Sequence, residues 1–172
     1  MSLVILDYDD TLFPTTYYQD HQDLTEKDFN KLDKAINKLI KIIFDKNYDI
    51  LIVSNGSIEW IKYSVNLLPS LKKFLDLNIV GCVSARDTYE NTDVPYESWK
   101  HYGIVNILTS GKFCNMNNIV GIGDAVLDYK AVSNACKYTN KNYEFIRFTP
   151  EMNLNTLTDT INKFSDYFKN KY

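Results

Sequence analysis

Short apolar runs alternate with longer amphipathic stretches along most of the chain. Five runs have the length and composition of strands buried in a parallel sheet, at residues 3–6, 50–53, 78–83, 119–122 and 143–148. Helical spacing predicts helices over residues 25–46, 57–68, 102–110, 125–135 and 153–169. This alternation predicts an α/β protein with a three-layer, Rossmann-like, doubly wound sheet of about five mainly parallel strands and helices on both faces.

The clearest helix, over residues 25–46, carries its lysines on the side opposite its apolar face. Its lysines on that side are Lys27, Lys31, Lys34, Lys38 and Lys41. We interpret them as a solvated face, and a docking surface for an anionic partner is the alternative.

Length and composition are those of a single globular domain. The 172 residues predict a single domain over 1–172, without linker, repeat or low-complexity tract, and 45% hydrophobic with 24% charged residues exclude disordered, collagen-like and coiled-coil classes. The net charge of −3 argues against the basic field of a usual nucleic-acid binder.

The three cysteines lack C-x-x-C spacing, which argues against a zinc ribbon or a disulfide framework. The sequence has neither a signal-peptide pattern nor an apolar stretch of membrane-spanning length, so we expect a cytoplasmic protein with no membrane partner. The oligomeric state is not predicted.

Acidic residues follow two of the predicted strands. Asp7 and Asp9 come directly after the first strand, and Asp124 and Asp128 follow the fourth, one helical turn apart. The carboxyl ends of parallel strands meet at one edge, where ligands of such sheets bind, so four carboxylates converge on an oxygen-rich site of the kind that Mg²⁺ prefers. The alternative is that these acids only cap turns and helices.

Two further features belong to the same edge. Ser54, Asn55 and Gly56 follow the second strand, where a hydroxyl and backbone amides can hold an anion, although an ordinary strand-to-helix turn would have the same sequence. A bound phosphate also needs a fixed cation. We expect Lys100, in a loop between the third strand and the helix at 102–110, to supply it, and Lys112, beyond that helix, to lie on the opposite edge.

In order and spacing, these residues resemble the four motifs of the haloacid dehalogenase (HAD) superfamily. The motif residues are Asp7-Tyr8-Asp9-Asp10-Thr11-Leu12, Ser54, Lys100, and Gly123-Asp124 with Asp128. The likeness extends from Leu3 to about Phe148. Further residues are similar to a group of short HAD-like proteins described as phosphatases: Trp60, Ser84-Ala85-Arg86, Pro95 and Trp99-Lys100.

The resemblance implies a phosphatase that works through an aspartyl-phosphate. Asp7 would be the nucleophile, and Asp9 would protonate the leaving oxygen and then deprotonate water. Mg²⁺ would be bound by Asp7, the Asp9 carbonyl and Asp124, with Asp128 bonding directly or through water. The phosphoryl oxygens would be held by Thr11, Ser54 and the Asn55 amide, with Lys100 neutralising their charge. Asp10 is expected to be a surface bystander.

The segments between these motifs leave no room for a cap domain. The loop over residues 13–23 would have to serve as a local flap, and we expect a large or extended phosphorylated substrate, a phosphoprotein in preference to a nucleic-acid end or a small metabolite. Arg86 would either reach the substrate or pair with Asp87 or Glu90. A HAD-derived binding or scaffold protein without turnover is the alternative function. A receiver domain is disfavoured because Ser84 stands where its phosphoacceptor acid is required.

Overall fold

Five parallel strands make the sheet of this protein, whose computed structural model describes residues 1–148 and 153–172. The strands are β1 (Ser2–Leu6), β2 (Tyr48–Ser54), β3 (Val80–Ser84), β4 (Asn118–Gly123) and β5 (Asn142–Arg147). They lie in the order β3-β2-β1-β4-β5, and all four neighbouring pairs are parallel. The predicted α/β architecture is confirmed.

The central strand β1 is buried on both faces because its side chains alternate between two apolar cores. Val4 and Leu6 belong to one core, and Leu3 and Ile5 to the other. Leu6 lies in register with Ile52 of β2, whereas its partner on the other side is in β4. A strand covered on both faces must be apolar throughout, and for this reason the strand at residues 3–6 could be predicted from the sequence.

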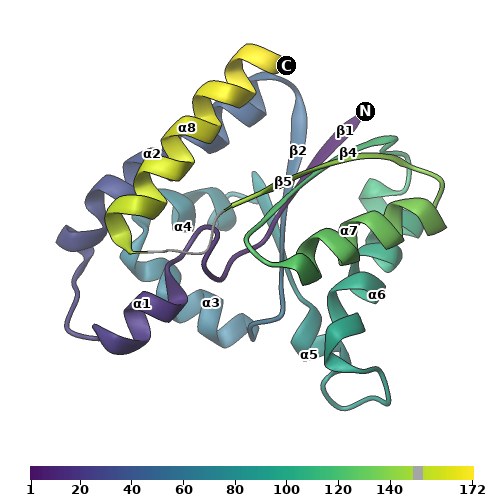
Figure 1. Ribbon diagram of the computed structural model, residues 1–172, viewed down its shortest axis with the longest axis horizontal. Coiled ribbons are helices and arrows are strands. Elements are labelled where there is room, and N and C mark those ends of the chain that lie inside the picture. Colours follow the sequence, from purple (N-terminus) through teal and green to yellow (C-terminus); the bar gives the residue numbers. More distant parts are fainter. Residues whose placement is uncertain (149–152) are drawn as a thin grey trace.

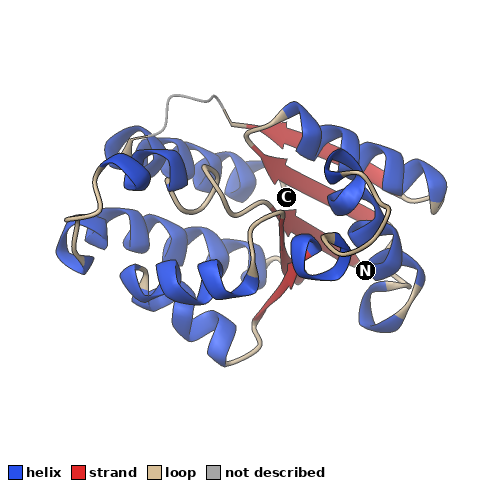
Figure 2. Ribbon diagram, turned by 90° about the horizontal axis from the view of Figure 1, so that it is seen from below, coloured by secondary structure: helices blue, strands red, loops and turns tan. Residues whose placement is uncertain are grey.

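Helices cover both faces of the sheet (Figures 1 and 2). On one side α2 (Glu26–Asp45) packs against α8 (Leu154–Lys171) and α4 (Pro69–Asp76), and on the other α6 (Tyr96–Thr109) packs against α7 (Val126–Tyr138). The five lysines named above on α2 are all exposed. The segment predicted at 57–68 is α3 (Ile58–Ser64) followed by a 3-10 turn at Val65–Leu67.

Two local predictions are wrong, and both concern short or interrupted helices. Residues 13–23 contain the helix α1 (Thr15–Asp20), and Phe13 and Tyr18 are buried against Phe29 and Trp60, so this segment is anchored in the core and is not a loop. Lys100 lies inside α6, which begins at Tyr96, and not in a loop. The short helices α4 and α5 (Ala85–Tyr89) were also not predicted.

The topology fixes where a ligand site can form. The chain moves from β1 outward to β3, and then returns to the other side of β1 at β4, so β1 and β4 flank the point where the strand order reverses. Open α/β sheets bind ligands beyond the carboxyl ends of such a pair. The described residues contain no separate cap domain over this edge, and none of their helices has the length and apolar character needed to cross a bilayer.

Candidate active site

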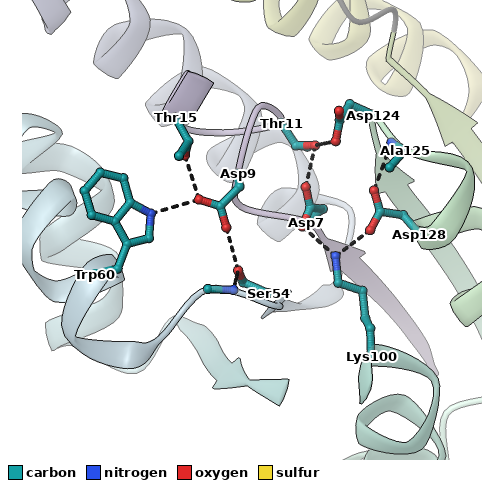
Figure 3. Close-up of polar contacts among 11 residues, drawn as sticks. Asp7, Asp9, Thr11, Thr15, Ser54, Trp60, Lys100, Asp124, Ala125 and Asp128 are labelled. Carbon is teal, nitrogen blue, oxygen red and sulfur yellow. Dashed lines mark hydrogen bonds and ion pairs between the residues drawn. The ribbon is translucent and has the colours of Figure 1, made fainter. Parts of the chain in front are cut away.

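A buried ion-pair cluster lies at the carboxyl ends of β1 and β4 (Figure 3). Lys100 reaches from α6 to Asp7, with 2.6 Å between Nζ and Oδ1, and forms a second ion pair with Asp128 of α7. All three side chains are at least nine-tenths buried. The Thr11 hydroxyl, also buried, donates to Asp7 Oδ2 at 2.9 Å and lies 3.5 Å from Asp124 Oδ1.

The acids of this cluster outnumber its one basic side chain. Burial raises the pKa of Asp7 to about 7 against the opposing effect of Lys100, and burial followed by the charge of Asp128 also raises the pKa of Asp124. Burial alone would lower the pKa of Lys100, but the Asp7 and Asp128 carboxylates outweigh it and raise this pKa, so Lys100 is a fixed cation. One ammonium therefore faces three carboxylates.

The donor set fits a divalent metal ion. Asp7, Asp124 and Asp128 each present a carboxylate oxygen, and these three oxygens lie within 4.8 Å of one another. Both oxygens of Asp128 already have partners, because Oδ1 pairs with Lys100 and Oδ2 accepts the Ala125 backbone N–H at 3.0 Å, at the start of α7. Asp7 is engaged in the same way, by Lys100 and by the Thr11 hydroxyl. Carboxylate oxygens at this spacing suit Mg²⁺, and its charge would offset the excess of acids.

Asp9 stands apart from the ion-pair cluster, and its hydrogen-bond partners among the described residues are neutral donors. Its Oδ1 accepts hydrogen bonds from the Thr15 hydroxyl at 2.6 Å and the Trp60 indole N–H at 2.8 Å, while its Oδ2 accepts one from the Ser54 hydroxyl at 2.8 Å (Figure 3). Neither Thr15 nor Trp60 is assigned a role from the sequence. Trp60 could have been suspected, because it is one of the residues shared with the short HAD-like proteins. No feature of the sequence pointed to Thr15.

The predicted anion-binding turn lies at the end of β2. Ser54 is fully buried, and its Oγ accepts the Gly56 backbone N–H at 2.7 Å while donating to Asp9. The cap of α3 is Ser57 and not Ser54. Asn55 lies between them with a buried Oδ1 that has no hydrogen-bond partner among the described residues. A Cβ on Gly56 would come within 2.9 Å of Asp9 Oδ2, so this turn requires glycine to approach the acid closely.

Three further residues considered in the sequence, Asp10, Arg86 and Lys112, lie outside the ion-pair cluster. Asp10 is half-buried and has a positive φ of 56°; its carboxylate accepts the Thr16 backbone N–H at 2.9 Å, so it holds the start of α1 and is more than a bystander. Arg86 pairs with Glu90 at 2.7 Å. Lys112 is exposed and pairs with Asp49 near the start of β2, on the edge opposite Lys100.

A cavity of about 460 Å³ opens beside Asp9. Helices α1 and α3 form its walls, and Arg86 of α5 lies at its margin. It is lined by Asp9, Thr15, Tyr18, Gln19, Gln22, Gly56, Ser57, Trp60, Tyr63 and Arg86. Apart from Asp9 and Arg86 the lining is neutral and partly aromatic, so the cavity suits the uncharged part of a ligand whose charged end lies at the cluster.

Comparisons with known proteins support the fold. No protein-family model matches the chain, and no curated protein matches its sequence. In structure it is similar to the HAD domain of the Legionella pneumophila effector Lem4, with a TM-score of 0.57 and 16% identity over 97% of this chain and 96% of that one. It is also similar to the L. pneumophila effector Ceg4, carrying an N-terminal yeast Hog1p sequence, with a TM-score of 0.55 and 12% identity over 94% of each chain. The chain therefore has the fold of a haloacid dehalogenase-like domain, as its motifs implied.

Proposed function

We propose that the protein is a Mg²⁺-dependent phosphomonoester hydrolase that acts through an aspartyl-phosphate on Asp7. The observation that carries the proposal is the buried contact of Asp7 with Lys100 at the point where the strand order reverses. A carboxylate oriented by a lysine at that point is a suitable nucleophile. Asp9, two residues further along, is oriented by three hydrogen bonds and borders the cavity, where it can exchange a proton with a leaving group.

The proposed reaction has two steps. Asp7 attacks phosphorus as the bond to the leaving oxygen breaks, and Asp9 gives its proton to that oxygen. Water then attacks the phosphorus of the aspartyl-phosphate, Asp9 takes a proton from the water, and the bond to Asp7 breaks to release phosphate. Lys100 compensates the charge on Asp7 and on the phosphoryl group, which is held by Thr11, Ser54 and the Asn55 amide.

A Mg²⁺ ion would be held by Asp7, the Asp9 carbonyl and Asp124. Asp128, which pairs with Lys100 and accepts the Ala125 backbone N–H, would contact the ion directly or through water. When bound, the ion supplies charge stabilisation for the phosphoryl oxygens, and it offsets the mutual repulsion of the buried acids.

Phosphate release from nitrophenyl phosphate tests this function. We expect release at mildly acidic to neutral pH that depends on added Mg²⁺ and stops with a chelator, and that is absent in Asp7→Asn. Release that is insensitive to the chelator contradicts the proposal. No release at high enzyme concentration with Mg²⁺ present also contradicts it, and favours the alternative of a HAD-derived binding protein without turnover.

A further inference from the structure

The two oxygens of Asp9 have different partners, and those partners come from different elements. Oδ1 accepts from Thr15 at the start of α1 and from the indole N–H of Trp60 in α3. Oδ2 accepts from the Ser54 hydroxyl at the end of β2 (Figure 3). The carboxylate is therefore held between three separate segments of the chain.

The chemistry of these donors decides where a proton on Asp9 can reside. An indole N–H is only a donor, so the oxygen that faces Trp60 must remain an acceptor. A hydroxyl, by contrast, can rotate to donate or accept. A protonated Asp9 therefore carries its hydrogen on Oδ2, the oxygen that faces the rotatable hydroxyl of Ser54. Because Ser54 is also a proposed phosphate ligand, its hydroxyl can turn to the phosphoryl group and leave Oδ2 free.

Trp60 is itself fixed by packing. Its ring lies edge-on to the buried Phe13, with centroids 5.6 Å apart, and stacks with Tyr63 at 6.1 Å. Its backbone N–H donates to the Ser57 hydroxyl at 3.2 Å, in the first turn of α3. A Cβ on Gly56 would lie 3.1 Å from Trp60 Cδ1, so the glycine allows the indole to approach the acid. The indole N–H is thus held in place by contacts that do not involve Asp9.

We propose that Trp60 is a positioning residue that, together with Thr15, anchors Oδ1 of Asp9 so that Oδ2 carries and delivers the catalytic proton. This proposal rests on the proposed function. The bond from phosphorus to the leaving oxygen breaks as the Asp7–phosphorus bond forms, and the proton passes from Oδ2 to the leaving oxygen. In the second step Oδ2 regains a proton from the attacking water, and phosphate leaves Asp7.

Dependence on the leaving group distinguishes positioning of the acid from a merely structural role. Nitrophenolate leaves without much help from an acid, whereas phenolate requires protonation, and both substrates present one aromatic ring to the same cavity. Trp60 and Thr15 also line the cavity, so loss of their contacts with the ring should affect both substrates alike. We expect Trp60→Phe and Thr15→Val to lower kcat/KM for phenyl phosphate about 10- to 100-fold more than kcat/KM for nitrophenyl phosphate. Thr15→Ser, which keeps the hydroxyl, should restore the phenyl phosphate rate.

The chain offers a matched control, because its other tryptophan makes a comparable bond elsewhere. The Trp99 indole N–H donates at 2.8 Å to the Val94 carbonyl, so Trp99→Phe should leave the ratio of the two rates unchanged. In the Asp9→Asn background, Trp60→Phe should have no additional effect on phenyl phosphate, because both changes remove the same proton transfer.

The hydrogen bond can also be observed without turnover. The two tryptophans give two indole N–H signals in a ¹H–¹⁵N spectrum, and Asp9→Ala should shift the Trp60 signal and leave that of Trp99 in place. If the wild type turns over but the ratio of kcat/KM for the two substrates is the same in Trp60→Phe, Thr15→Val and wild type, the positioning role alone is overturned. An unshifted Trp60 signal overturns the hydrogen bond itself. Absence of Mg²⁺-dependent turnover in the wild type overturns the proposed function, and the positioning role with it.

Discussion

Asp7 and Asp9 are separated by one residue but have different electrostatic surroundings. Asp7 is buried against the Lys100 ammonium, whereas Asp9 contacts two hydroxyls and an indole N–H. Lys100 opposes the effect of burial on the pKa of Asp7 and favours the ionised form that a nucleophile needs. The three donors around Asp9 instead orient its carboxylate. The two side chains therefore suit different steps of one reaction.

Substitution of each acid should have a distinct result. Asp7→Asn should abolish turnover because the amide cannot form the bond to phosphorus. Asp9→Asn should lose about 10²- to 10⁴-fold in rate, the usual value of a proton-transfer group, and can retain a slowly hydrolysed aspartyl-phosphate. Intact-mass spectrometry after mixing with substrate measures the adduct. A phosphoryl adduct that persists in Asp7→Asn would place the nucleophile elsewhere.

The two lysines considered in the sequence provide a second comparison. Lys100→Ala should reduce kcat/KM far more than Lys112→Ala, because Lys100 is buried between Asp7 and Asp128 whereas Lys112 makes an exposed pair with Asp49. Loss of Lys100 leaves two buried acids without a cation, so folding of both variants is checked by circular dichroism with Mg²⁺ present. Equal kinetics for the two folded variants would contradict the role of Lys100.

At the scale of the elements, the site residues themselves made α6 difficult to predict. Its inward-facing residues include Lys100, Ile104 and Leu108, which recur every four positions. A lysine at the first of these positions interrupts the apolar pattern. The hydrophobic pattern alone therefore predicts a helix that begins at residue 102, after Lys100, whereas α6 begins at Tyr96. The long helix α2 contains one buried acid, Asp33, but its apolar stripe is otherwise continuous, and its predicted bounds at 25–46 differ from the structure by one residue at each end.

Glu144 joins β5 to the C-terminal helix and should make stability depend on pH. It pairs with Lys171, the main cause of its lowered pKa, and accepts a hydrogen bond from the Tyr172 hydroxyl at 2.6 Å. An acid whose pKa is lower in the folded state stabilises the fold above its unfolded pKa, and that contribution is lost as the pH falls. Glu144→Gln should therefore lower Tm by a few degrees at neutral pH, and the difference from wild type should diminish in acid.

A pair on the outer side of α8 provides the control for this measurement. Lys38 and Asp166 are 2.8 Å apart and both are largely exposed, so Asp166→Asn should change Tm less than Glu144→Gln does. A Tm difference for Glu144→Gln that persists unchanged in acid would show that its effect comes from packing and not from the charge.

At the scale of the whole molecule, the central strands of the sheet were predictable because β1, β2 and β4 contain buried apolar runs. The prediction that all five strands are buried is wrong for the edge strands: β3 is partly buried, and β5 contains Glu144 and has exposed ends. The topology of the sheet brings Asp7 and Asp124 together from distant parts of the sequence. Their proximity could be predicted because both residues follow parallel strands, whose carboxyl ends meet at one edge of the sheet. The partners of Asp9 were less predictable, because Thr15 and Trp60 contact it through the packing of α1 against α3, which leaves no periodic signal in the chain.

The absence of a cap domain over the described residues of the site has a consequence for the substrate. The cavity beside Asp9 is bordered by α1 and α3, and no further domain in the described residues covers a ligand that extends beyond it. A small metabolite gains binding energy from its non-reacting parts only when they are enclosed. A phosphorylated side chain of a protein can occupy the cavity while the rest of the partner contacts α1, α3 and Arg86.

We therefore predict that the protein prefers a phosphoprotein to sugar phosphates, nucleotides or phosphorylated oligonucleotides. The net charge of −3 disfavours nucleic acid, because few backbone phosphates could be neutralised. The measurement is kcat/KM across phosphopeptides, sugar phosphates, nucleotides and 3′- or 5′-phosphorylated oligonucleotides, together with the mass in solution, since a neighbouring subunit could serve as a lid. A monomer that hydrolyses one small metabolite at about 10⁵ M⁻¹s⁻¹, an ordinary value for a dedicated enzyme, and ignores the phosphopeptides would contradict the preference.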